Sequence, residues 1–175
     1  MIYPDAEKIK EKEILFIKKT DEKISIWEGE KLSLENKIYK NPVADVQNII
    51  FQSKNAVRYS VDIHKDIANN TKAKIYCLGK YTKSELNKLF ENEIIHPYEN
   101  YSSEALIDLI SKETEYNRTY IVIKGEGGSR YISDQLLKLG KVVDQLNVYR
   151  RNEINAFISE KDLSDKDPTL SLIHI

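Results

Sequence analysis

The sequence is poor in the residues from which metal sites and disulfides are built. It has one cysteine, Cys77, and three histidines, His64, His96 and His174, which lie far apart along 175 residues. A single cysteine cannot form an internal disulfide, and no spacing here resembles that of metal ligands. We therefore expect neither a disulfide framework nor a bound metal.

Long apolar runs and an excess of one charge are absent as well. No stretch approaches the roughly 20 apolar residues of a membrane helix, and the start, MIYPDAEKIKEKE, lacks the apolar block of a secretory signal. The 27 basic and 28 acidic side chains exclude a polybasic nucleic-acid arm, and a hydrophobic content of 41% excludes a disordered chain. These features predict a cytoplasmic, globular protein that binds neither membrane nor nucleic acid.

Short apolar runs alternate with amphipathic stretches through the middle of the chain. Runs rich in Ile, Val and Tyr predict strands at residues 48–51, 74–78, 93–96, 119–123 and 142–148. Apolar residues three and four apart predict helices at residues 53–67, 82–90, 102–112 and 129–139. We expect N-caps at Ser53, Thr82 and Ser102, and a C-terminal stop at Gly140.

This alternation of strands and helices predicts an α/β fold. Five strands would form a flavodoxin-like parallel sheet, in the order 2-1-3-4-5, with helices on both faces. The loops after the carboxyl ends of such strands lie along one edge of the sheet, where ligands bind. Here those loops are residues 52–55, 79–82, 97–103 and 124–130.

The four loops share a chemistry suited to anions. Each joins a small or hydroxyl-bearing residue to a helix start, so free backbone N–H groups and the positive end of a helix dipole are available. Lys54, Lys80, Lys124 and Arg130 add positive charge. The pattern favours a site for a small polyanion, although caps and single lysines also occur at βα turns that bind nothing.

The densest glycine cluster is KGEGGSR, at residues 124–130, which holds three of the six glycines. It lacks the third glycine of GxGxxG and the GK[ST] of a phosphate loop, so a nucleotide or flavin site is only weakly supported. Gly127 and Gly128 would either let a ligand approach the backbone closely or simply allow a tight turn.

Five spaced segments together resemble the uroporphyrinogen-III synthase family. They are FQSKNAV at residues 51–57, LGKYT at 78–82, SSEAL at 102–106, KGEGGSR at 124–130 and VDQLNVYRR at 143–151. The resemblance implies a two-lobed enzyme, each lobe flavodoxin-like, with a two-stranded ladder between the lobes and the active site in the cleft.

The resemblance also implies a division of this chain. Residues 1–42 would form a partial first lobe, with a strand at 14–17 and an outgoing connection at 37–42. Residues 43–147 would form a complete lobe. The returning connection would lie at about residues 146–151. Residues 148–169 would contain the returning linker and the start of a truncated first lobe. Residues 170–175, LSLIHI, read as a non-native tail, or else as an ordinary disordered tail.

The reaction implied is a hydro-lyase step in haem and other tetrapyrrole biosynthesis. The family cyclises hydroxymethylbilane to uroporphyrinogen III, inverts the last pyrrole ring and releases water, without a cofactor. We expect a monomer, and we expect this chain to be inactive by itself because one wall of the cleft would be missing. The alternative is a non-catalytic module that binds a small acidic ligand or a partner protein.

The loops and the resemblance together give the candidate site. Tyr149 is the expected catalytic residue, which helps the substrate hydroxyl to leave, and the alternative is a packing tyrosine at a strand end. Gln52 stands where the family often has threonine, and Ser129 where it often has arginine. The expected substrate-binding residues are Gln52, Ser53, Gly79, Thr82, Ser102, Ser103, Lys124, Gly127, Gly128 and Arg130.

Overall fold

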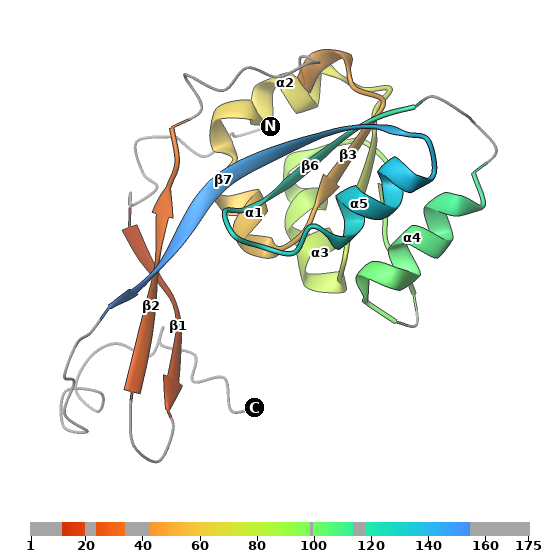
Figure 1. The fold of residues 1–175 in the computed structure, drawn as a ribbon. Helices are drawn as coiled ribbons and strands as arrows, with labels where there is room; N and C mark the ends of the chain where they lie inside the picture. The colour runs from red at the N-terminus through yellow and green to blue at the C-terminus, as the bar shows by residue number, and fades with distance from the viewer. Residues whose placement is uncertain (1–11, 20–23, 34–42, 99, 114–117, 155–175) are drawn as a thin grey trace.

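The computed structural model describes residues 12–19, 24–33, 43–98, 100–113 and 118–154 (Figure 1). Its strands are β1 (Lys12–Lys19), β2 (Ile24–Lys31), β3 (Asn48–Phe51), β4 (Lys74–Cys77), β5 (Ile94–Ile95), β6 (Thr119–Gly125) and β7 (Val142–Ile154). Its α-helices are α1 (Lys54–Arg58), α2 (His64–Asn69), α3 (Lys80–Leu89), α4 (Ser103–Ser111) and α5 (Tyr131–Lys138). Two short 3-10 helices, η2 (Val43–Asp45) and η3 (Val61–Ile63), precede β3 and α2.

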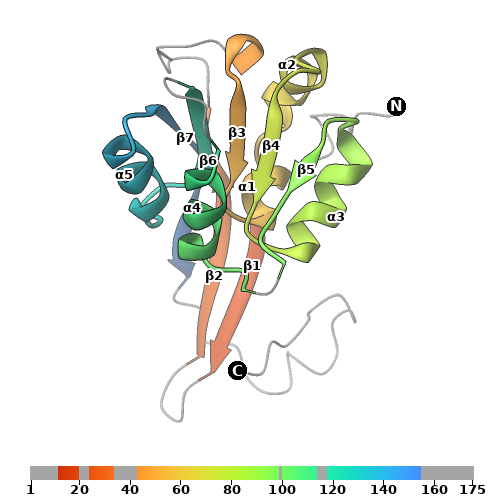
Figure 2. The same ribbon diagram turned by 90° about the vertical axis from the view of Figure 1, so that its right-hand side faces the viewer.

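The strands form one mixed sheet in the order β1-β2-β7-β6-β3-β4-β5. The five strands expected from the sequence are all present, and each pairs in parallel with its neighbours from β7 to β5 (Figure 2). The α/β class is therefore confirmed. The expected flavodoxin-like order is wrong, because these five strands lie in the order 3-2-1-4-5.

The observed order follows from where the chain changes direction. Helices α1, α2 and α3 pack on one face, so β4 and β5 are added on the same side of β3. The chain then passes to the other face through α4 and places β6 on the free side of β3. Because the connections are right-handed, adding β6 on the other side of β3 requires the chain to change face. The apolar pattern does not show whether this change of face follows the second parallel strand or the third.

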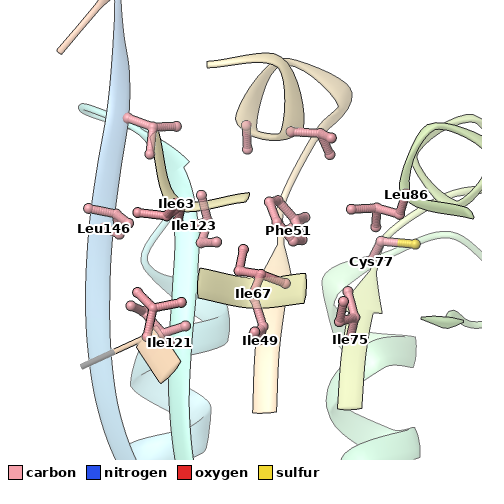
Figure 3. Close-up of a cluster of buried hydrophobic side chains, with 14 of the residues drawn as sticks. Ile49, Phe51, Ile63, Ile67, Ile75, Cys77, Leu86, Ile121, Ile123 and Leu146 are labelled. Carbon is pink, nitrogen blue, oxygen red and sulfur yellow. The ribbon is translucent and has the colours of Figure 1, made fainter. Parts of the chain in front are cut away.

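Alternate residues of the parallel strands supply two cores. Ile49 and Phe51 of β3 face the cluster beneath α1, α2 and α3 (Figure 3), and Ile50 faces the cluster beneath α4 and α5. In β6, Ile121 and Ile123 follow the first pattern. Strands buried on both faces are nearly continuous in apolar residues, which is why the sequence located them correctly.

The last strand has two kinds of neighbour. Residues 142–149 of β7 pair in parallel with β6, and residues 149–154 pair antiparallel with residues 26–31 of β2 (Figure 1). Between Lys124 and Gly125 the register moves from Asn147 to Tyr149, so Val148 is an extra residue in β7. This bulge places Tyr149 on the same face as Leu146 and Val148, in one core cluster.

The N-terminal part differs in detail from the expectation. The strand expected at residues 14–17 lies within β1, which pairs antiparallel with β2 as a hairpin. Strand β2 was not predicted, although ISIW begins with the alternation of a strand. It is β2 that pairs with the returning segment, and the outgoing connection expected at residues 37–42 lies outside the described residues.

The helix expected at residues 53–67 is divided into α1, η3 and α2. In a continuous helix the Val57 carbonyl would accept the N–H of Val61. Instead the Ser60 hydroxyl donates to this carbonyl at 2.9 Å, and His64 Nε2 lies 3.1 Å from it. Side chains thus take over the carbonyl that the helix needs, a form of competition that hydrophobic periodicity cannot show.

Two of the three expected N-caps are confirmed. The hydroxyls of Ser53 and Ser102 each accept a backbone N–H, from Ala56 and Ala105, at 3.1 Å. Thr82 was expected to cap its helix, but α3 begins at Lys80 and Gly79 is the cap residue. Gly140 follows α5 with φ of 72°, the left-handed conformation that ends many helices.

The buried imidazole of His64 predicts a loss of stability in mild acid. Burial lowers the pKa of His64 to about 4, so the folded state keeps it neutral where the unfolded chain, with a pKa near 6.5, is protonated. The free energy of unfolding should fall as pH drops from 6.5 towards 4, by about 2 kcal/mol at pH 5. Urea unfolding at pH 7 and pH 5 measures this, and His64→Gln should remove most of it. Parallel losses in both proteins would contradict the assignment.

Candidate functional site

The candidate site lies where β3 and β6 run side by side. The helix after β3 covers one face of the sheet and the helix after β6 covers the other, so their loops diverge at the carboxyl ends. Such switch points are where α/β sheets bind ligands. The loops that meet here begin at Gln52 and at Glu126.

The loop after β6 opens with a tight turn from Gly125 to Gly128. The N–H of Gly128 donates to the Gly125 carbonyl at 3.1 Å, and Gly127 has φ of 68°. A positive φ at the third position is typical of a type II turn and favours glycine. The turn uses the Gly128 N–H as its own donor. The small size of Gly128 matters for the close packing of the turn, because an added Cβ would lie 3.0 Å from the Gly125 carbonyl oxygen.

Two side chains from the sheet hold the second half of this loop. Lys124, only 3% exposed, donates from Nζ to the Gly128 carbonyl at 2.5 Å. The Gln52 side-chain amide donates to the Ser129 carbonyl at 3.2 Å. Burial, with a further contribution from nearby Arg130, lowers the pKa of Lys124. The expected anion-binding lysine therefore bonds to the protein backbone.

Tyr149 lies directly beside the start of the same loop. A Cβ built on Gly125 would lie 2.6 Å from Cζ of Tyr149, so the hydroxyl-bearing end of the ring covers that glycine. The ring stacks on Tyr59 with centroids 5.2 Å apart, and Tyr149 is 6% exposed. Tyr149 thus packs in the core and also brings its hydroxyl end next to the glycine loop.

The loop is also tied to β7 on its outer side. The N–H of Glu126 donates to the Tyr149 carbonyl at 2.8 Å, and the Glu126 carboxylate accepts a hydrogen bond from Arg150. Both contacts connect the glycine loop to the part of β7 that continues into the hairpin. The position of the loop therefore depends on β7 as well as on β6.

Free backbone donors remain in the loop. Among the described residues, the N–H groups of Gly127, Ser129 and Arg130 have no hydrogen-bond partner. These residues are exposed, and α5 begins at the next position, Tyr131. Exposed amides at the start of a helix provide an anion-binding surface. These amides can donate hydrogen bonds to an anion such as a carboxylate.

Comparison with known proteins identifies the family. A family profile described as uroporphyrinogen-III synthase HemD matches residues 28–166. The chain is also similar to a uroporphyrinogen-III synthase of Proteus mirabilis, with 30% identity over 141 residues that cover 79% of this chain and 69% of the relative. The chain belongs to the uroporphyrinogen-III synthase family. The resemblance expected from the five sequence segments is thereby confirmed.

Most residues expected in this synthase-family site follow strands of the parallel sheet, whereas Lys124 lies within β6 and Tyr149 within β7, and they are not equally close. Ser53 caps α1 beside Gln52, at the switch point. Ser102 caps α4 and Ser103 begins it, after the edge strand β5, and no hydrogen bond joins them to the glycine loop in the part of the chain that the structure describes. Gly79 precedes α3, while Thr82 is buried within that helix and 6% exposed.

The charges expected along this edge also differ in their accessibility. Lys54, Lys80 and Arg130 are exposed, and Arg130 lies 3.8 Å from Asp134. The contacts made by Gln52 and Lys124 were not foreseen, since hydrogen bonds to distant carbonyls have no sequence signature. The pairing of Tyr149 with Tyr59 was missed for the same reason.

Neither a membrane-spanning helix nor a cluster of metal ligands occurs in the described part of this family member. No helix within the described ranges is long and apolar enough to cross a membrane. The same residues contain no group of three or more His, Cys, Asp or Glu side chains placed to bind a metal.

Proposed function

We propose that this family member acts as a uroporphyrinogen-III synthase, which cyclises hydroxymethylbilane to uroporphyrinogen III. The observation that carries the proposal is the exposed glycine-loop amides beside Tyr149, in a chain of this family. The substrate bears many acetate and propionate carboxylates, which such amides bind. The product is formed with the last pyrrole ring inverted and with loss of water.

The proposed chemistry needs a positioned proton donor and no cofactor. A phenol holds its proton at neutral pH, so Tyr149 would protonate the terminal hydroxyl as it leaves as water. The azafulvene cation that remains would be attacked by the substituted carbon of the last ring, which gives a spirocyclic intermediate. That intermediate reopens and recloses with the ring inverted, and the proton released on rearomatisation restores the phenol.

The carboxylate-binding part of the proposal rests on donors of this chain. The amides of Gly127, Ser129 and Arg130 are free within the described residues, and the exposed Arg130 side chain adds positive charge. The hydroxyl of Ser53 accepts the Ala56 N–H, and its own hydrogen remains available to a ligand. Gly79 and Ser102 would contribute as the cap residues of α3 and α4 at the same edge, and Thr82 and Ser103 from the first turns of those helices.

A conversion assay tests the proposal. Freshly prepared hydroxymethylbilane is incubated with the protein, and the isomers formed are separated. A synthase yields mainly the type III isomer, whereas spontaneous closure yields type I. If the protein gives only type I at the spontaneous rate, the proposal is wrong and a non-catalytic binding module remains.

A further inference from the structure

Two side chains hold the second half of the glycine loop, Lys124 from a buried position and Gln52 through an exposed contact. Lys124 points from β6 to the Gly128 carbonyl, and Gln52 reaches from the end of β3 to the Ser129 carbonyl. Lys124 is almost fully buried, so the carbonyl that it holds faces the protein interior. Two consecutive carbonyls are thus fixed by side chains from two different strands.

The orientation of these carbonyls decides the orientation of the next amides. No peptide bond in the described structure is cis, and in a trans peptide the N–H points opposite to the C=O of the same plane. The N–H of Ser129 therefore points away from Lys124, and the N–H of Arg130 points away from Gln52. These are two of the amides that have no partner within the described residues.

We propose that Lys124 and Gln52 are positioning residues of this loop. Each side chain fixes one carbonyl towards itself, and the following N–H thereby points the opposite way, as a donor for a carboxylate of an acidic tetrapyrrole. The inference rests on the proposed function for the identity of the ligand. It replaces the expectation that both side chains bind the substrate themselves.

The test uses two variants and two matched controls. Lys124→Met and Gln52→Met each remove the donor and keep a side chain of similar length. Lys74→Met is the control for the first, because Lys74 bonds Glu113 at the amino end of β4. Gln47→Met is the control for the second, because Gln47 flanks the other end of β3 and bonds Thr119.

The readout is binding of uroporphyrin, a stable porphyrin whose side chains are only acetates and propionates, to the ¹⁵N-labelled 175-residue chain. Both site variants should raise the Kd about tenfold or more, since misdirected amides lose hydrogen bonds to a charged group. The amide resonances of Ser129 and Arg130 should already move in the ligand-free variants. The two controls should change neither quantity, and Lys124→Arg, which keeps a donor, should recover part of the affinity.

Two results would overturn the inference. If Lys124→Met weakens binding while the Ser129 resonance of the free protein stays in place, Lys124 contacts the ligand directly. If both site variants bind uroporphyrin as the wild type does, the loop does not need them. These binding results are independent of turnover. If the protein makes no type III isomer but its variants show the expected binding losses, only the proposed function is refuted.

Discussion

Replacing Tyr149 by phenylalanine should slow type III synthesis by the active protein by a factor of about 10² to 10⁴, because one positioned proton donor is lost. The substitution keeps the ring, and the ring is what stacks on Tyr59 and covers Gly125. Stability should therefore change little, and the loss should lie in kcat, since binding is assigned to the loop amides. Single-turnover rates with hydroxymethylbilane measure the chemical step directly.

Tyr120→Phe is the matched control for this substitution. Tyr120 is 1% exposed on the opposite face of the sheet, and its hydroxyl has no hydrogen-bond partner among the described residues. Removing that hydroxyl should leave the rate of type III synthesis unchanged. Equal rates for the wild type and Tyr149→Phe would remove Tyr149 from the catalytic step and leave it as a packing residue.

Substituting alanine for Gly125 is expected to damage both stability and activity. The added Cβ would lie 2.6 Å from Cζ of Tyr149, closer than carbon atoms approach, and that ring is buried between Gly125 and Tyr59. Overpacking of this kind costs about 1–3 kcal/mol of unfolding free energy. The displaced phenol would also lose its alignment with the substrate, and a 1 Å error of position can reduce rates about 10²-fold.

Gly79→Ala is the control for stability, because a Cβ at that position would meet no atom within 4 Å. Thermal unfolding of the two variants separates overpacking from the general effect of replacing a glycine. Combining Gly125→Ala with Tyr149→Leu, which opens space beside the glycine, should cost less than the two single losses added together. Additive losses would show that Gly125 does not contact the ring in solution.

The sequence predicts the parallel strands well and their spatial order poorly. The strand NIIF was located to the residue as β3, because both of its faces are buried and its apolar run is therefore continuous. The predicted order 2-1-3-4-5 was wrong in one respect, namely the strand after which the chain crosses to the other face of the sheet. The point of crossing depends on which face each helix packs against, and amphipathic helices fit either face equally well.

The sequence singled out the glycine loop and Tyr149 but not the contacts that hold them. Motif spacing led to the loop after β6 and to Tyr149, which the structure places side by side. The interpretation of Lys124 as a free cation failed because a basic side chain in a glycine-rich loop looks the same in sequence whether it faces solvent or a carbonyl. Thr82 failed as a cap because α3 begins two residues earlier, at Lys80.

The extra residue Val148 determines which face of the sheet Tyr149 occupies. In a regular strand Tyr149 would project to the face opposite Leu146 and Val148, but the bulge sets all three in one cluster. Straightening β7 at its present length would turn the phenol towards α4 and α5, away from Tyr59, whereas deleting the extra residue would restore the alternation and leave the phenol on the face of Leu146. Any chimera that exchanges the hairpin or β7 with a relative must therefore keep the bulge and the present number of residues between Lys141 and Tyr149 together, or remove both.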